Sequence, residues 1–207
     1  SRQTENKEMY DMSNQHINKS IDMMFKTPSQ YITMEFQGGE PLLAFDKIKY
    51  AIKKSLDLNK IFKRELTFVI CTNMVPITDE ILLFCKKYKV LLSTSYDGPE
   101  EIHNANRIYT KGNGHQKVMD GIKKARQVIG GDRVSALMTT TNLTLDYPVE
   151  IINNYIENNF FSIFLRPISP YGFAKKNKKK NKYDIERFVE FYKKGLLHII
   201  DLNNKGT

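Results

Sequence analysis

The stretch MEFQGGEPLLAF, residues 34–45, joins a segment of strand-like pattern to one of helix-like pattern. Ile32, Met34 and Phe36 alternate with polar residues, which is typical of a strand with one buried face. Two glycines, a glutamate and a proline follow, and apolar residues then recur at helical spacing from Phe45 onward. A strand that runs through a short polar loop into a helix is the repeating unit of α/β proteins.

The rest of the chain continues this alternation. We predict five parallel strands with outer helices, at 31–37, 66–72, 90–95, 133–140 and 160–167. The near-continuous apolar run LTFVICT at 66–72 is typical of a strand covered on both faces. A helix near 13–25 has no strand before it, so we expect that a strand precedes residue 1. The predicted fold is thus an α/β partial barrel of six βα units with its first strand missing, and the edge beside 31–37 should be covered by loops or a neighbouring molecule.

Length and composition favour one soluble domain over residues 1–207. The chain has 41% apolar and 27% charged residues, which fits a soluble globular protein rather than a disordered one. No apolar run approaches the ~20 residues of a membrane helix, and the N-terminus lacks a signal-peptide core. We therefore expect a cytoplasmic location. Because residue 1 is serine, we also expect a fragment of a longer protein.

The net charge of +9 comes mostly from one tract. The tract KKNKKKNK at 175–182 holds six lysines, and the net charge without them is +3. Nucleic acid is therefore an improbable partner on charge grounds. We interpret the tract as a solvated loop, with a docking patch for an acidic partner as the alternative.

The two cysteines, Cys71 and Cys85, have no zinc or redox spacing. Two thiols without a pattern indicate a reducing compartment and a structural role. We predict that this chain alone makes no metal site.

Polar residues or glycines follow each predicted strand, and ligands of parallel α/β folds bind at the carboxyl ends of the strands. The ends carry Gly38, Gly39 and Glu40; Thr72 and Asn73; Ser95 and Asp97; Thr139, Thr140, Thr141 and Asn142; and Arg166. Backbone carbonyls at Gly38 and Gly39 could accept hydrogen bonds from an ammonium group, and Glu40 adds a carboxylate. This corner suits a zwitterionic amino acid. The alternative is a plain tight turn in which Glu40 caps the helix that begins near Leu42.

Two of these strand ends resemble a known family. GGEPLL (38–43) resembles the motif by which radical S-adenosylmethionine (SAM) enzymes hold the amino group of that cofactor. TSYDGPEEIHNANR (94–107) resembles the Ser-x-Asp-Gly-Pro-x-x-x-His segment of the peptide-modifying, SPASM-type branch, which includes the anaerobic sulfatase-maturating enzymes. SRQTENKEMYDMS (1–13) and FLRPISPYGFA (164–174) look closest to the radical maturase of the His-Xaa-Ser peptide system.

The resemblance implies a radical SAM core that modifies a peptide or protein through a 5′-deoxyadenosyl radical. It implies SAM and, in the full-length enzyme, a 4Fe-4S cluster whose ligand cysteines are not in this chain. The three-cysteine motif and the C-terminal auxiliary-cluster domain of the family are absent from the sequence, so we expect the fragment itself to be inactive.

The resemblance also assigns roles to the strand-end residues. Gly38, Gly39 and Glu40 would contact the amino group of the cofactor, and Ser95 its carboxylate or ribose. Thr72 and Asn73 would serve the ribose or shape their own loop. Arg107 would pair with the cofactor carboxylate or with a carboxylate of the protein. Asp97 and His103 are expected to shape the turn, and no catalytic residue is assigned.

Two other function classes stay open on the sequence. A non-catalytic α/β barrel could bind a peptide or an adenosyl ligand with the same strand ends. An ordinary α/β enzyme, such as a phosphosugar aldolase, would need a phosphate-cradling glycine loop after a late strand, which RPISPYGFA (166–174) does not supply.

Overall fold

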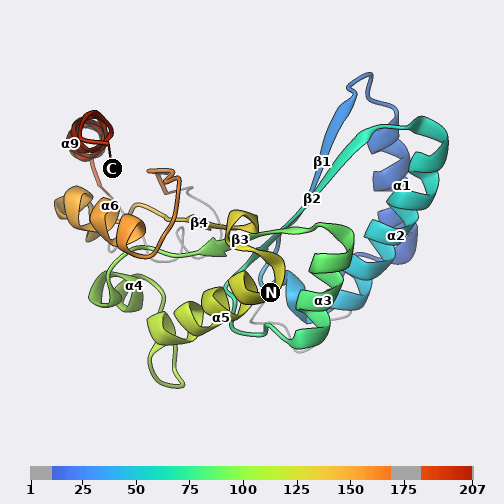
Figure 1. Ribbon diagram of the computed structural model, residues 1–207, viewed down its shortest axis with the longest axis horizontal. Coiled ribbons are helices and arrows are strands. Elements are labelled where there is room, and N and C mark those ends of the chain that lie inside the picture. The colour runs from blue at the N-terminus through green and yellow to red at the C-terminus, as the bar shows by residue number, and fades with distance from the viewer. Residues whose placement is uncertain (1–10, 169–182, 207) are drawn as a thin grey trace. The chain divides into compact units, whose positions relative to one another are not determined.

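The computed structural model describes residues 11–168 and 183–206, and its sheet has four parallel strands in the order β1-β2-β3-β4 (Figure 1). The strands are β1 (Tyr31–Phe36), β2 (Glu65–Thr72), β3 (Leu91–Ser95) and β4 (Val134–Leu137). In the β1/β2 pair, Tyr31 lies opposite Glu65 and Phe36 opposite Ile70. The predicted α/β class is confirmed, and four of the five predicted strands are present.

Helices follow the strands, as the alternation predicts. They are α1 (Asn14–Phe25), α2 (Phe45–Phe62), α3 (Asp79–Tyr88), α4 (Glu100–Asn106), α5 (Gly114–Ile129), α6 (Pro148–Glu157) and α9 (Ile185–Asn204), with short 3₁₀ turns η2 (Pro41–Ala44), η3 (Gly131–Arg133) and η4 (Thr144–Asp146). Ser13 and Thr78 cap α1 and α3 by accepting from main-chain N–H groups of the first turn. Helix α4 follows Asp97, Gly98 and Pro99, and Glu100 and Glu101 in its first turn favour it electrostatically.

The predicted strand at 160–167 is wrong. Thr140 N–H donates to the Arg166 carbonyl at 3.0 Å, but Arg166 N–H turns back to the Phe164 carbonyl at 2.8 Å. A local turn of this kind uses the donor that a strand ladder would need. Phe161 is 90% exposed, so the apolar run FFSIFL (160–165) does not mark a strand buried on both faces.

Strand β4 is also shorter than the predicted 133–140. It ends at Leu137 because backbone N–H groups of the residues that follow donate to acceptors outside the strand ladder. Thr139 N–H donates to the Asp97 carboxylate at 3.0 Å, and Thr140 N–H donates to Arg166.

The chain forms two compact units. In the described residues, unit 1 comprises 11–93 and 121–134, and unit 2 comprises 94–120, 135–168 and 183–206. That residues 1–207 act as one domain, with a further strand before residue 1, stays a prediction. The lysine tract 175–182 lies outside the described residues.

In unit 1, helices cover one face of the β1/β2 pair. A core of Ile17, Ile21, Phe25 and Ala51 packs against Met24, Met34, Phe36, Tyr50, Leu58 and Leu66. On the opposite face, Thr33, Glu35 and Thr67 are exposed and Cys71 is half-buried. The prediction that 66–72 is covered on both faces is therefore wrong: β2 alternates between a buried and an accessible side.

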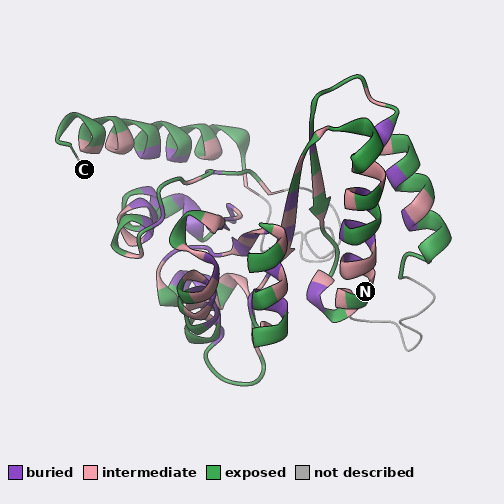
Figure 2. Cartoon of the chain, turned by 45° about the vertical axis from the view of Figure 1, so that its right-hand side comes forward, coloured by how far each residue is buried: buried purple, intermediate pink, exposed green. Residues whose placement is uncertain are grey.

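In unit 2, α9 packs against α6, and most of its remaining surface is exposed (Figure 2). Phe191 and Gly195 are the buried residues of α9. A Cβ atom at Gly195 would lie 2.8 Å from Leu165 Cδ1, so this position accepts only glycine without a shift. Across the described part of the chain, no helix combines the length and apolar character needed to cross a membrane.

Candidate functional site

The carboxylate of Glu40 joins the loop after β1 to the end of β2, both in unit 1. Thr72 Oγ1 donates to Glu40 Oε1 at 2.7 Å, and Asn73 N–H donates to Oε2 at 2.8 Å. Leu42 N–H donates to Oε1 at 3.2 Å, so Glu40 also caps η2. The cap that the sequence offered as the alternative role of Glu40 is thus present, and contact between Glu40 and an ammonium group stays a prediction.

The glycines before Glu40 leave their backbone accessible. Gly38 has φ +153°, a value that side chains disfavour. A Cβ atom built on Gly38 or Gly39 would meet no other atom within 4 Å. The space that a side chain would occupy at either glycine is therefore open, and both residues are exposed.

Thr72 and Asn73 shape the loop that follows β2. The Thr72 hydroxyl is buried and accepts from Met74 N–H at 3.1 Å, while Asn73 Oδ1 accepts from Val75 N–H at 3.0 Å. Met74 takes a left-handed conformation at φ +59°. These contacts show that Thr72 and Asn73 shape their own loop, which is one of the two predicted roles. A ribose contact for either residue stays a prediction.

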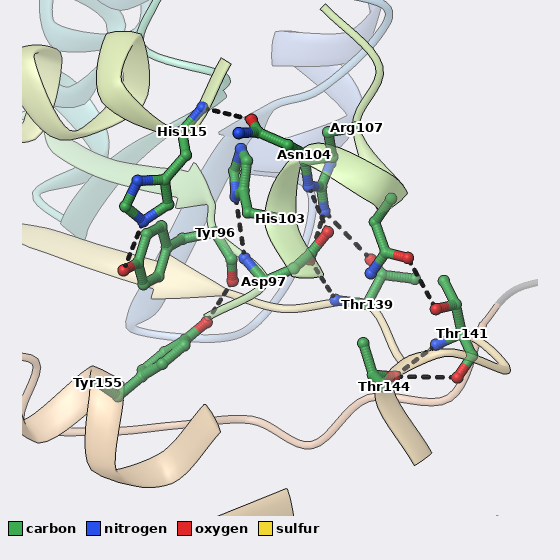
Figure 3. Close-up of polar contacts among 11 residues, drawn as sticks. Tyr96, Asp97, His103, Asn104, Arg107, His115, Thr139, Thr141, Thr144 and Tyr155 are labelled. Carbon is green, nitrogen blue, oxygen red and sulfur yellow. Dashed lines mark hydrogen bonds and ion pairs between the residues drawn. The ribbon is translucent and has the colours of Figure 1, made fainter. Parts of the chain in front are cut away.

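In unit 2, Asp97 lies at the centre of a buried polar network (Figure 3). Arg107 binds it in a two-pronged ion pair, Nε to Oδ2 at 2.8 Å and Nη2 to Oδ1 at 2.9 Å. Thr139 N–H donates to Oδ1 at 3.0 Å. Asp97 is 1% exposed, so these donors replace the water that the carboxylate loses. Of the two partners predicted for Arg107, the structure shows the protein carboxylate.

The turn after β3 depends on Gly98 and His103. Gly98 has φ +100°, and a Cβ there would lie 3.1 Å from Ile151 Cγ1, so both conformation and space require glycine. The buried His103 Nδ1 accepts from Asp97 N–H at 3.3 Å. Burial lowers the pKa of His103 to about 4, which keeps the imidazole neutral and able to accept. This agrees with the predicted turn-shaping roles.

Two buried tyrosines support the same turn, and the sequence did not single them out. Tyr155 Oη donates to the Tyr96 carbonyl at 2.5 Å, and Tyr96 Oη donates to Asn154 Oδ1 at 2.5 Å. Burial raises the pKa of both phenols. His115 Nε2 lies 3.2 Å from Tyr96 Oη, and its side chain is 14% exposed. The Tyr96 position inside the Asp-Gly-Pro motif was the available signal.

Each unit thus gathers its own set of predicted site residues. Unit 1 brings Gly38, Gly39, Glu40, Thr72 and Asn73 to the ends of β1 and β2. Ser95, half-buried at the end of β3, and Arg107 belong to unit 2.

Neither cysteine is placed as a cluster ligand. Cys85 is fully buried, and burial raises the pKa of its thiol to about 12. Cys71 donates to Glu35 Oε1 at 2.7 Å. In residues 11–168 and 183–206, no group of three or more His, Cys, Asp or Glu side chains is arranged to hold a metal. That the cluster cysteines lie outside this chain stays a prediction.

Curated relatives share a large part of this sequence. The chain is 28% identical over 161 residues to a serine-type anaerobic sulfatase-maturating enzyme of Bacteroides thetaiotaomicron, covering 76% of this chain and 38% of the relative. It is 25% identical over 198 residues to a cysteine-type anaerobic sulfatase-maturating enzyme of Clostridium perfringens, covering 92% and 50%. A protein of Methanothermobacter thermautotrophicus is 29% identical over 160 residues, covering 77% and 58%. The chain thus spans between 38% and 58% of the length of these relatives.

Solved structures share the fold. Native anSMEcpe with bound AdoMet superposes with a TM-score of 0.78 at 20% identity, covering 95% of this chain and 54% of that one. The same protein with AdoMet and the Kp18Cys peptide gives a TM-score of 0.76 at 21% identity, covering 89% and 51%. The model of the radical SAM superfamily matches residues 2–155. Because that match covers most of the chain, this protein belongs to the radical SAM superfamily, and it is related to the peptide-modifying anaerobic sulfatase maturases.

Proposed function

We propose that this chain is the SAM-binding core of an enzyme that modifies a residue of a peptide or protein. The superfamily match and the relationship to sulfatase maturases support the reaction class. The observation that carries the proposal is the geometry of Gly38, Gly39 and Glu40, which we call the glycine corner. Here the Glu40 carboxylate joins the loop after β1 to the end of β2, directly after two exposed glycines.

The corner fits an ammonium group. Gly38 and Gly39 are exposed, and their carbonyl oxygens are groups that can accept N–H bonds. Glu40 fixes the path of this main chain through its bonds to Thr72 and Asn73. Its negative charge also favours a cation nearby, and hydrogen bonds between charged groups are stronger than neutral ones. In this proposal Gly38, Gly39 and Glu40 bind the amino group of SAM.

The roles predicted for Ser95 and Arg107 are also part of the proposal. Ser95 is the last residue of β3, and Asp97 two residues later is fixed by Arg107 and Thr139. The ion pair therefore holds the chain that follows Ser95, so that its hydroxyl can meet the carboxylate or ribose of the cofactor. Arg107 acts in this proposal mainly as the group that positions Asp97, with a direct cofactor contact as its second role.

When bound, SAM together with a 4Fe-4S cluster, for which this proposal assigns no ligand in this chain, would supply a 5′-deoxyadenosyl radical for hydrogen abstraction from a peptide residue. The residues of this chain bind and orient the cofactor. The finer assignment, to the maturase of a His-Xaa-Ser peptide system, rests on residues 1–13 and 164–174. A cytoplasmic location and an acidic partner for the lysine tract 175–182 are further parts of the proposal.

The test uses the full-length protein, purified and reconstituted without oxygen. Incubation with SAM and a strong reductant should release 5′-deoxyadenosine, measured by chromatography and mass spectrometry. Release of 5′-deoxyadenosine supports the proposal that the full-length protein is a radical SAM enzyme. Binding of SAM without any cleavage, in protein that carries a reducible cluster, would favour the non-catalytic binding module instead.

A further inference from the structure

The main-chain carbonyl of Tyr96, one residue after Ser95, is held by a side chain from helix α6. Tyr155 Oη donates to this carbonyl at 2.5 Å, and Tyr155 is only 1% exposed. Burial raises the pKa of the Tyr155 phenol, so the hydroxyl keeps its proton and acts as a donor. Figure 3 shows the Tyr155 side chain directed at the main chain of this turn. The chain directly after Ser95 is therefore tied to α6.

The peptide group between Tyr96 and Asp97 is also fixed on its other side. Asp97 N–H donates to His103 Nδ1 at 3.3 Å, and the N–H and C=O of one planar peptide group point in opposite directions. The preceding peptide group is fixed as well, because Tyr96 N–H donates to the Leu137 carbonyl at 3.2 Å. Bonds to α4, α6 and the end of β4 thus hold the main chain between Ser95 and Asp97.

Helix α6 lies close enough to the turn for this contact because position 98 is glycine. A Cβ atom at Gly98 would lie 3.1 Å from Ile151 Cγ1. Ile151 and Tyr155 are four residues apart in α6, so they lie on the same face of the helix. Asn154 Oδ1 accepts from Tyr96 Oη at 2.5 Å, which is a second bond between α6 and Tyr96. The contact of Tyr155 is therefore part of the close packing of α6 on the turn.

We propose that Tyr155 is a positioning residue for the cofactor contact assigned to Ser95. Its hydroxyl fixes the Tyr96 carbonyl, and this sets the path of the main chain at the end of β3, where Ser95 is half-buried. The inference rests on the proposed function, because it names a residue that acts through Ser95. Without the Tyr155 hydroxyl, the Tyr96 carbonyl would be free to rotate, and the Ser95 hydroxyl would lose its defined direction toward SAM.

The experiment measures SAM affinity by titration calorimetry on the full-length protein, reconstituted without oxygen. The proteins are wild type, Ser95→Ala, Tyr155→Phe and the double variant. Ser95→Ala should weaken SAM binding about tenfold, because one hydrogen bond is lost, and Tyr155→Phe should weaken it about three- to tenfold. In the double variant, Tyr155→Phe should cause no further loss, since the hydroxyl through which it acts is gone. A residue that only stabilises the fold would not show this coupling.

Tyr96→Phe is the matched control. It removes a buried hydroxyl from the same pair of packed rings and leaves the Tyr96 carbonyl bonded to Tyr155. Both Tyr→Phe variants should melt below wild type, but Tyr96→Phe should bind SAM with wild-type affinity. If Tyr155→Phe does not fold, His103→Leu takes its place, because it removes the acceptor on the other side of the same peptide group. Its effect on SAM affinity should be coupled to Ser95→Ala in the same way.

Three results would overturn the inference. They are unchanged SAM affinity in Tyr155→Phe, losses that add in the double variant, and an equal loss of affinity in Tyr96→Phe. If wild type binds no SAM, the proposed function itself fails. That outcome is distinct from SAM binding by wild type without coupling between Tyr155 and Ser95.

Discussion

The Thr72 hydroxyl donates a hydrogen bond to Glu40 Oε1 at 2.7 Å, which ties the end of β2 to the loop after β1. The side chain of Thr72 is buried, and the carboxylate also caps η2 through Leu42. Glu40 therefore contributes both to the stability of unit 1 and to the shape of the main chain at Gly38 and Gly39. Any test of the corner has to separate these two contributions.

The buried ion pair of Asp97 and Arg107 should dominate the stability of the turn after β3. Asp97→Ala leaves the Arg107 guanidinium and Thr139 N–H without their acceptor, so we expect a loss of about 3 kcal/mol in the free energy of unfolding. Urea denaturation measures this loss.

Asp146→Ala is the control for that variant, because it breaks the exposed ion pair with Arg187 in the same unit. Its expected cost is below about 1 kcal/mol. Equal costs for the two variants would contradict the central role given to Asp97.

His103 should make the protein less stable in acid. Its pKa in the folded state is about 4, below the ordinary value of 6.5, so protons bind the unfolded state more readily. The stabilising contribution is complete above pH 6.5 and is lost as the pH falls toward 4, by roughly 2–3 kcal/mol. His103→Gln should flatten this part of the pH dependence in thermal melts between pH 7 and 4.

His16→Gln is the comparison for that experiment, since His16 is exposed in α1. It reports the effect of a histidine-to-glutamine change at a surface position. A His103→Gln variant with the same acid sensitivity as wild type would show that His103 is not buried as a neutral group.

The two cysteines should differ in reactivity. Cys85 is buried in the folded protein and becomes accessible only on unfolding. The raised pKa of its thiol also keeps the thiol protonated, and a protonated thiol is unreactive. Cys71 is half-buried on the accessible sheet face. A thiol-reactive dye should label Cys71 in the native protein and both cysteines in denaturant, as read by peptide mass spectrometry. Rapid labelling of Cys85 under native conditions would be inconsistent with the core described for unit 1.

The sequence predicts well those features that depend on local pattern. The alternating residues of 31–36 and the apolar period of α2 and α3 specify their elements, because each segment carries one clear buried face. The caps Ser13 and Thr78 act within one turn of their own position, so they too are visible in the sequence.

Features that depend on distant partners were missed. The segment 160–167 has a strand-like composition, yet Arg166 N–H bonds locally to Phe164, and no pattern in the sequence shows that choice. The run LTFVICT is nearly continuously apolar, but only the helices packed beside it determine which face is covered. For Arg107 the sequence predicts a carboxylate partner without saying which one, because the pairing with Asp97 depends on a turn that brings positions ten residues apart together.

The most direct test of the account measures SAM affinity for the full-length, anaerobically reconstituted protein by titration calorimetry. The variants are Glu40→Gln and, as a stability control, Thr78→Ala, which removes the cap of α3 in the same unit at a cost of about 1 kcal/mol. Both variants should melt below wild type. Only Glu40→Gln should weaken SAM binding, by about ten- to a hundredfold, because it loses a charge-assisted contact of about 1.5–3 kcal/mol. Unchanged affinity in Glu40→Gln, or an equal loss in Thr78→Ala, would contradict the assignment of the Gly38-Gly39-Glu40 corner as the site that binds the amino group of SAM.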